Sequence, residues 1–145
     1  MLESIFAPYS SVGLLILRIG LAVVFIAHGW PKINPNSPMK GITGVTAFFK
    51  QAGVVMPGLL AWVVALLETV GSVLLILGLG TRILAVGFVI DMIHAIWLAR
   101  IKIGKAQFTG GGGIGWEFEF VLMVGALALL FTGAGSISLD RLIGL

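Results

Sequence analysis

Four long apolar runs dominate this chain of 145 residues and decide what it can fold into. Crossing the roughly 30 Å hydrocarbon layer of a membrane as an α-helix takes about 20 residues. The runs lie at residues 12–30, 58–79, 82–100 and 115–132. Because lipid offers no partner to backbone N–H and C=O groups, the runs should be helices. The sequence therefore predicts an all-α integral membrane four-helix bundle, with residues 1–145 forming a single domain.

Composition supports a membrane protein and removes several classes of function. Hydrophobic residues make up 59% of the chain and charged residues only 10%, whereas a soluble surface needs roughly 25–35% charged residues. The basic residues sit in short segments between the apolar runs, so we expect no nucleic acid partner. With no cysteine, the chain cannot supply a thiolate zinc site, an iron–sulfur cluster or thiol chemistry.

Lysine and arginine residues outside the runs or at their ends predict the orientation. Residues 31–57 and 100–115 hold six of them, whereas the opposite side has only Arg82 and Arg141. Since cytoplasmic loops carry the excess of basic residues, both longer loops should lie in the cytoplasm and both termini outside. The first run is interpreted as a retained span, because Glu3 and no basic residue precedes it.

The first loop is predicted to hold a short helix that lies in the membrane interface. Prolines at positions 31, 35, 38 and 57 bound this loop, and apolar residues between them recur at helical spacing. These apolar residues are Val45, Phe48, Phe49 and Ala52. A half-apolar helix of this kind is typical of an interfacial segment, serving either as a structural element or as a substrate gate.

Ionisable side chains inside or at the edge of the apolar runs are the best guide to function. A charge near the bilayer centre costs about 2.5–3.5 kcal/mol, so such residues should face the bundle and find partners. They are Arg18, His28, Glu68, Asp91, His94, Glu117 and Glu119. The helical rise places Arg18 and Glu68 in the outer half, where an ion pair between them is expected, and the histidines and later glutamates in the inner half.

The helix faces agree with a polar interior. Three stripes combine ionisable with small residues: Arg18, Ala22, Phe25 and Gly29; Glu68, Gly71, Leu75 and Gly78; and Gly87, Asp91 and Ala95. Small residues allow membrane helices to approach closely. Asp91 and His94, one turn apart, should either satisfy each other or relay protons. Glu117 and Glu119 differ by about 200° around a helix, so only one of them should face the bundle.

At these residues the chain resembles the DoxX family of small four-helix bacterial membrane proteins, essentially from end to end. The residues that carry the resemblance are, in order, Arg18, Phe25, His28, Gly29, Lys32, Glu68, Gly71, Gly78, Thr81, Arg82, Met92, His94, Phe108, Gly115, Trp116, Glu117, Gly133, Gly135, Ser138, Leu139 and Asp140. Asp91 and Glu119 are not recognised family positions. The resemblance implies a bacterial inner-membrane bundle and, in some members, quinone-coupled sulfur oxidation or defence against thiol and quinone stress, with partner subunits.

The first functional hypothesis is a quinone-linked oxidoreductase subunit that binds a quinone in the bundle. Quinone reduction needs an apolar slot, donors for two carbonyl oxygens and a route for two protons. The residues assigned to catalysis are His94, Asp91 and Glu117, and those assigned to ligand binding are Arg18, His28, Glu68 and Trp30. Electrons would come from a partner redox subunit. One histidine per helix does not favour haem, and no metal site is expected.

Two other classes of function stay open. The same polar interior could bind a membrane lipid or another hydrophobic ligand without catalysis, or it could scaffold a partner enzyme. A proton-coupled transporter would want Glu68 or Asp91 in a water-accessible cavity and usually an inverted repeat. The sequence leaves open whether the chain is itself an enzyme and whether it forms a homo-oligomer.

Overall fold

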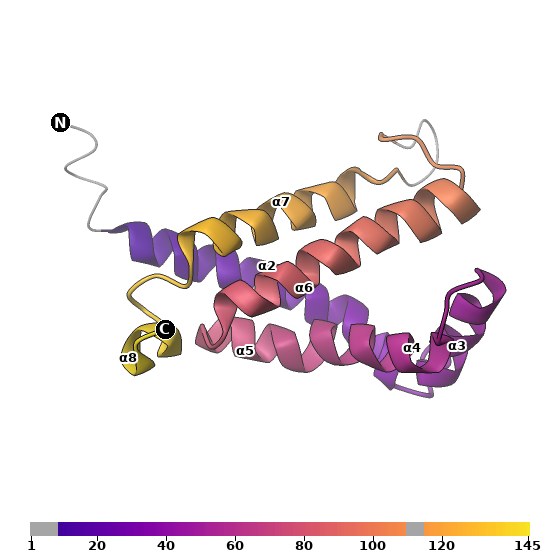
Figure 1. Ribbon diagram of the computed structural model, residues 1–145, viewed down its shortest axis with the longest axis horizontal. Helices are drawn as coiled ribbons and strands as arrows, with labels where there is room; N and C mark the ends of the chain where they lie inside the picture. The colour runs from indigo at the N-terminus through magenta and orange to yellow at the C-terminus, as the bar shows by residue number, and fades with distance from the viewer. Residues whose placement is uncertain (1–8, 110–114) are drawn as a thin grey trace.

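The computed structural model describes residues 9–109 and 115–145, and these residues form an elongated helical bundle (Figure 1). The helices are α2 (Ser10–Ile33), α3 (Gly41–Gln51), α4 (Pro57–Leu66), α5 (Ser72–Leu77), α6 (Thr81–His94), α7 (Glu117–Thr132) and α8 (Leu139–Ile143). Two π-helical segments, η2 (Leu67–Gly71) and η3 (Ala95–Ile103), continue α4 into α5 and extend α6. The prediction of an all-α membrane bundle is confirmed.

Three helices within the described residues are long and apolar enough to cross a membrane: Ser10–Ile33, Pro57–Leu77 and Thr81–Ile103. The fourth long helix, α7, has 16 residues, or about 24 Å at the α-helical rise. It packs along α6, and Figure 1 shows the two side by side. The ends of these four long helices lie within three residues of the ends of the predicted apolar runs.

Prolines and glycines fix where these helices begin and end. Pro57 occupies the first turn of α4, where its missing N–H is not needed. Gly78, with φ +67°, ends α5 in the left-handed conformation that glycine adopts without strain. Gly80, with φ +66°, completes the tight turn into α6. Two long helices can therefore reverse direction within three residues.

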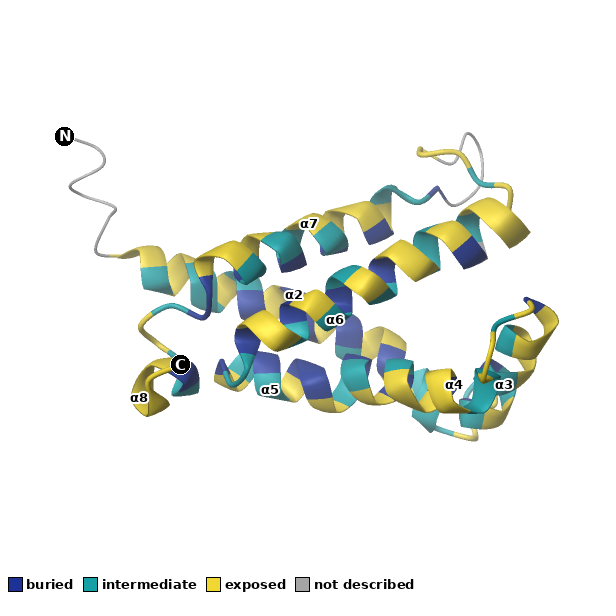
Figure 2. Cartoon of the chain, in the orientation of Figure 1, coloured by how far each residue is buried: buried dark blue, intermediate teal, exposed yellow. Residues whose placement is uncertain are grey.

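Buried residues follow the inner faces of the rods (Figure 2). The first two predicted stripes are confirmed, because all four residues of each stripe are buried. The third stripe is packed but lies at the edge of the core, since a Cβ atom added at Gly87 would lie 3.1 Å from the Leu67 side chain. Gly87, Asp91 and Ala95 are half-buried, whereas Ala85, Phe88 and Met92 fill the core. Phe88 stacks on Phe25 with ring centroids 4.1 Å apart.

Residues 34–56 and 104–109 lie at one end of the bundle, and the C-terminal segment lies at the other (Figure 1). The helix predicted in the first loop forms as α3, which packs on α4. Lys102 Nζ, on η3, donates a hydrogen bond of 3.1 Å to the carbonyl oxygen of Ala52, just after α3. Helix α8 contacts the α5–α6 turn, where the Asp140 N–H donates to the Gly78 carbonyl oxygen over 2.8 Å.

Candidate functional site

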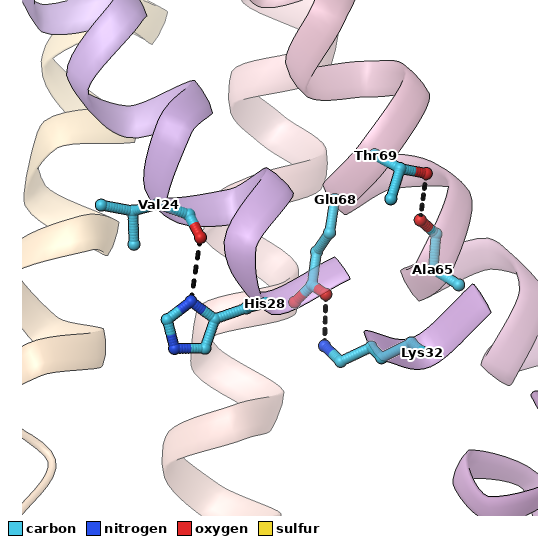
Figure 3. A network of polar contacts seen from close by, with 6 residues as sticks. All are labelled: Val24, His28, Lys32, Ala65, Glu68 and Thr69. Carbon is cyan, nitrogen blue, oxygen red and sulfur yellow. Dashed lines mark hydrogen bonds and ion pairs between the residues drawn. The ribbon is translucent and has the colours of Figure 1, made fainter. Parts of the chain in front are cut away.

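An ion pair between Lys32 and Glu68 joins α2 to η2 (Figure 3). Gly29 allows these helices to touch, since a Cβ atom added there would lie 2.7 Å from the Glu68 Cβ atom. Glu68 sits in the π-helical segment, a local rewinding that is frequent at functional sites. The Lys32 and Glu68 side chains keep 17% and 3% of their surface exposed, so the pair is largely removed from solvent.

The expected ion pair between Arg18 and Glu68 is not formed. The contact of Gly29 with Glu68 sets the register of the two helices. Arg18 lies eleven residues earlier on α2, about 16 Å along the axis, which is too far for its side chain to reach Glu68. Lys32, close to that contact, takes the place of Arg18 as the partner of Glu68.

Arg18 instead lies fully buried at the opposite end of the bundle. Its guanidinium donates to the Ile137 carbonyl oxygen. Nearby, the Asp140 carboxylate accepts the Gly80 N–H over 2.6 Å and the Thr81 N–H over 2.9 Å. Burial alone would raise the pKa of Asp140, but these hydrogen bonds and the positive charge of Arg18 outweigh it and lower that pKa. This end of the bundle is therefore tied by the C-terminal segment.

A second ion pair joins η3 to the first turn of α7. Arg100 Nη2 and Nε each lie 2.6 Å from Oε1 of Glu119. Glu119 is buried, whereas Glu117 is half-buried, in line with the expectation that only one of the two faces the bundle. Both ion pairs lie toward the end of the bundle that carries the basic loops.

Between these pairs lies a cavity of about 130 Å³. Its lining combines four ionisable side chains with apolar ones: Phe25, His28, Lys32, Glu68, Met92, Ala95, Phe118, Glu119 and Leu122. An apolar protein cavity of about 150 Å³ is large enough for benzene, so this one has room for a single six-membered ring. His28 and Phe118 are exposed and their rings lie 5.5 Å apart, which places the mouth of the cavity at the surface between α2 and α7.

Several buried carboxylate oxygens near this cavity have no hydrogen-bond partner among the described residues. They are Oδ2 of Asp91, Oε2 of Glu117 and Oε2 of Glu119. Asp91 does not line the cavity but lies within Coulombic reach of Glu68 and Lys32. Buried polar atoms are normally paired, so unpaired ones call for a partner from outside the chain, such as a ligand, a proton or water.

The two histidines make the same local hydrogen bond but occupy different places. Nδ1 of His28 lies 2.9 Å from the Val24 carbonyl oxygen (Figure 3), and Nδ1 of His94 lies 2.9 Å from that of Ile90. Because a carbonyl oxygen only accepts, each Nδ1 carries the hydrogen and each neutral ring keeps Nε2 as an acceptor. His28 lines the cavity, whereas His94 does not.

The remaining predicted site residues separate from this cluster. No hydrogen bond between Asp91 and His94 forms within the described residues, because the His94 ring bonds to its own helix. Trp30 is 61% exposed and is absent from the cavity lining. In residues 9–109 and 115–145, no group of three histidine, aspartate or glutamate side chains is placed to hold a metal ion. Two of the seven predicted site residues, His28 and Glu68, line the cavity, and the sequence did not assign Lys32, Phe118 or Glu119 to the site.

A bundle of apolar helices with buried ion pairs and a small ionisable cavity defines the class: a multi-pass membrane protein with a polar interior. The family model that describes DoxX matches residues 13–101. The chain belongs to the DoxX family.

Named relatives agree with this assignment. Inner membrane protein YphA of Escherichia coli (strain K12) is 34% identical over 140 residues, covering 94% of this chain and 94% of that protein. A Bacillus subtilis (strain 168) protein named "Putative oxidoreductase CatD" is 33% identical over 129 residues, covering 89% of this chain and 85% of its own. No solved structure matches the chain. Its membrane-spanning helices and inner-membrane relatives make it a multi-pass protein of the bacterial inner membrane.

Proposed function

We propose that the chain binds the single-ring head group of a quinone in the cavity between α2 and α7 and acts as a quinone-linked oxidoreductase subunit. The observation that carries this proposal is the lining of a ring-sized cavity by both aromatic and ionisable side chains. Ligand sites in proteins combine mostly apolar walls with a few well-placed polar groups. The Bacillus subtilis relative named "Putative oxidoreductase CatD" supports the same class of function.

The residues present fit a benzoquinone ring. Phe25 and Phe118 offer aromatic surface, and Met92 adds a soft apolar contact. Lys32 Nζ has three N–H donors and gives one to Glu68, so it keeps donors for a carbonyl oxygen. His28 Nε2 accepts an O–H when the ring is neutral and donates an N–H when it is protonated. The isoprenoid tail would leave through the mouth beside His28 and Phe118, where the protein surface meets lipid.

A bound quinone supplies a couple that takes up two electrons and two protons. The protons would be held at His28 Nε2 and at the free Oε2 of Glu119. Asp91 and Glu117, whose buried oxygens also lack partners among the described residues, would resupply them. This assignment places on His28 the role that the sequence suggested for His94. The electrons would come from a partner redox subunit, since the chain has no cysteine for an iron–sulfur centre.

A quinone titration with two matched histidine variants tests this proposal. His28→Gln and His94→Gln remove the same kind of side chain from the same local hydrogen bond, but only His28 lines the cavity. Losing one hydrogen bond to the ring should weaken binding of a short-chain benzoquinone about fivefold to tenfold in His28→Gln. His94→Gln should bind like the wild type.

The measurement is isothermal titration calorimetry on the protein in detergent, with organic extraction of the purified protein to identify what is bound. Quinone in the extract, together with a selective effect of His28→Gln, supports the proposal. Equal affinity in all three proteins would contradict it. A phospholipid in the extract, with no benzoquinone binding, would favour the non-catalytic lipid-binding alternative instead.

A further inference from the structure

A second cavity, of about 140 Å³, lies at the end of the bundle opposite Lys32. It is formed where α6 begins and α7 ends, under the C-terminal segment. Its polar lining consists of Arg82, Thr132, Ser138, Asp140 and Arg141. It shares no lining residue with the cavity between α2 and α7, so it has to be explained separately.

The two arginines of this cavity are not neutralised by the part of the chain that the structure describes. Neither Arg82 nor Arg141 takes part in an ion pair there. Asp140 is the acidic side chain in the lining, but its two oxygens already accept the N–H groups of Gly80 and Thr81. Counted over side chains, the lining therefore carries two positive charges and one negative charge.

The Arg82 guanidinium is held in place while most of its donors stay free. Its Nε donates to the Leu130 carbonyl oxygen over 3.2 Å. It also lies against Gly133, where an added Cβ atom would be 3.0 Å from Nη2. Nη1 and Nη2 take part in no hydrogen bond within the described residues. A planar guanidinium with free donors matches the geometry of a phosphate oxyanion.

The charge pattern of the whole chain makes this cluster unusual. Arg82, the first residue of the third apolar run, and Arg141, beyond the fourth, are the two basic residues that the sequence places at this end outside the spans' interior. Both line one cavity. Buried Arg18 adds a third positive charge close to Asp140. The sequence predicts that this end faces the outer side, where inner-membrane proteins keep basic residues few, so the meeting of two arginines at one point favours a specific anion.

We propose that this cavity binds a phosphate group, supplied by the head group of an anionic phospholipid. The surface around it fits the lipid source, because Phe131, Leu142 and Leu145 are 78%, 79% and 74% exposed. These side chains would lie among acyl chains while the arginines hold the phosphate at the head-group level. Free inorganic phosphate carries the same chemistry, and the test below separates the two sources.

Native mass spectrometry of the protein in detergent, titrated with phosphatidylglycerol, measures the binding. The double variant Arg82→Gln with Arg141→Gln should bind roughly tenfold more weakly for each arginine removed, because charge-assisted hydrogen bonds are lost. The matched control is Lys40→Gln with Lys50→Gln, which removes the same charge from exposed side chains at the opposite end. Equal weakening in both double variants, or in neither, would overturn the proposal.

A second measurement uses the wild-type protein and so does not depend on the variant folding. Phosphatidylglycerol should protect Arg82 and Arg141 from modification by phenylglyoxal, while Arg100 at the opposite end serves as the internal control. If millimolar inorganic phosphate gives the same protection, the site binds phosphate without the lipid tails; if it does not, the phospholipid is the ligand. Absence of selective protection by either would overturn the proposal.

Discussion

Removing the charge of Lys32 should destabilise the protein more than removing the charge of Glu68, although both changes break the same ion pair. Glu68 keeps only 3% of its side-chain surface exposed and lies in Coulombic reach of Asp91. In Lys32→Met, its carboxylate would stay buried beside the carboxyl group of Asp91 without a cation. Removing one partner of a buried pair in this way costs about 3–5 kcal/mol.

The reverse change should cost less. In Glu68→Gln, the ammonium group of Lys32 is left over, but Lys32 sits in the last turn of α2 and keeps 17% of its side-chain surface exposed. A lysine in that position can turn its charge toward the interface while its stem stays packed. The expected cost is about 1.5 kcal/mol, the lower end for a hydrogen bond to a charged group.

Reversible unfolding in mixed micelles with increasing dodecyl sulfate, followed by circular dichroism, measures both costs. The double variant Lys32→Met with Glu68→Gln should lose less than the sum of its parts, by at least about 1 kcal/mol, because no buried charge is then left unpaired. Lys50→Met, an exposed lysine beyond the bundle interior, should unfold like the wild type.

Two results would refute this reasoning. Equal costs for the two single variants would mean that burial does not decide the asymmetry, and an additive double variant would mean that the side chains do not interact. A second cycle, Arg18→Met with Glu68→Gln, should be additive, because the two residues lie about 16 Å apart along the helices. Strong coupling there would restore the pairing that the sequence suggested.

Other variants test the helix contact and the C-terminal segment. Gly29→Ala should cost about 1–3 kcal/mol by overpacking, since its Cβ atom would lie 2.7 Å from that of Glu68; Gly20→Ala, with no atom within 4 Å, should gain about 0.5–1 kcal/mol in the same unfolding assay. The pKa of Asp140 is lower in the folded protein than in the unfolded chain. Its carboxylate therefore adds fully to the free energy of unfolding above its ordinary pKa, and this contribution is lost as the pH falls through the pKa of the folded state. Wild-type stability should therefore drop by about 1.5–3 kcal/mol in acid, whereas Asp140→Asn should lack that stability at every pH and show a flatter acid limb.

The fold could be predicted from the sequence because the length and hydropathy of each apolar run determine its own helix. Each apolar run needs internal hydrogen bonds in lipid, and Pro57, Gly78 and Gly80 stop or start helices through their own backbone preferences. The inner faces of the first two long helices were accessible for the same reason. Small residues beside Arg18 and Glu68 left one plausible packed stripe on each helix.

The ion pairs could not be predicted from the sequence, because they depend on how neighbouring helices are placed against each other. The register of α2 against η2 follows from the contact of Gly29 with Glu68, and that contact selects Lys32 over Arg18. On α6, Gly87 and Ala85 both begin stripes of small or apolar residues at helical spacing. Packing in the core, where Phe88 of α6 stacks on Phe25 of α2, buries the stripe that starts at Ala85.

The position of the apolar core relates the two candidate sites to each other. Phe25, Leu75, Phe88 and Leu129 are each less than 2% exposed. Phe25, Phe88 and Leu129 lie on their helices between the polar residues of one end and those of the other. The stacked rings of Phe25 and Phe88 leave a tightly packed layer between the carboxylate-rich end and the arginine-rich end. A proton-coupled transporter has to open a polar path through such a layer, whereas a ring ligand entering beside His28 and a phosphate held by Arg82 each use one end only. The packing therefore favours a protein that binds separately at its two ends over one that conducts between them.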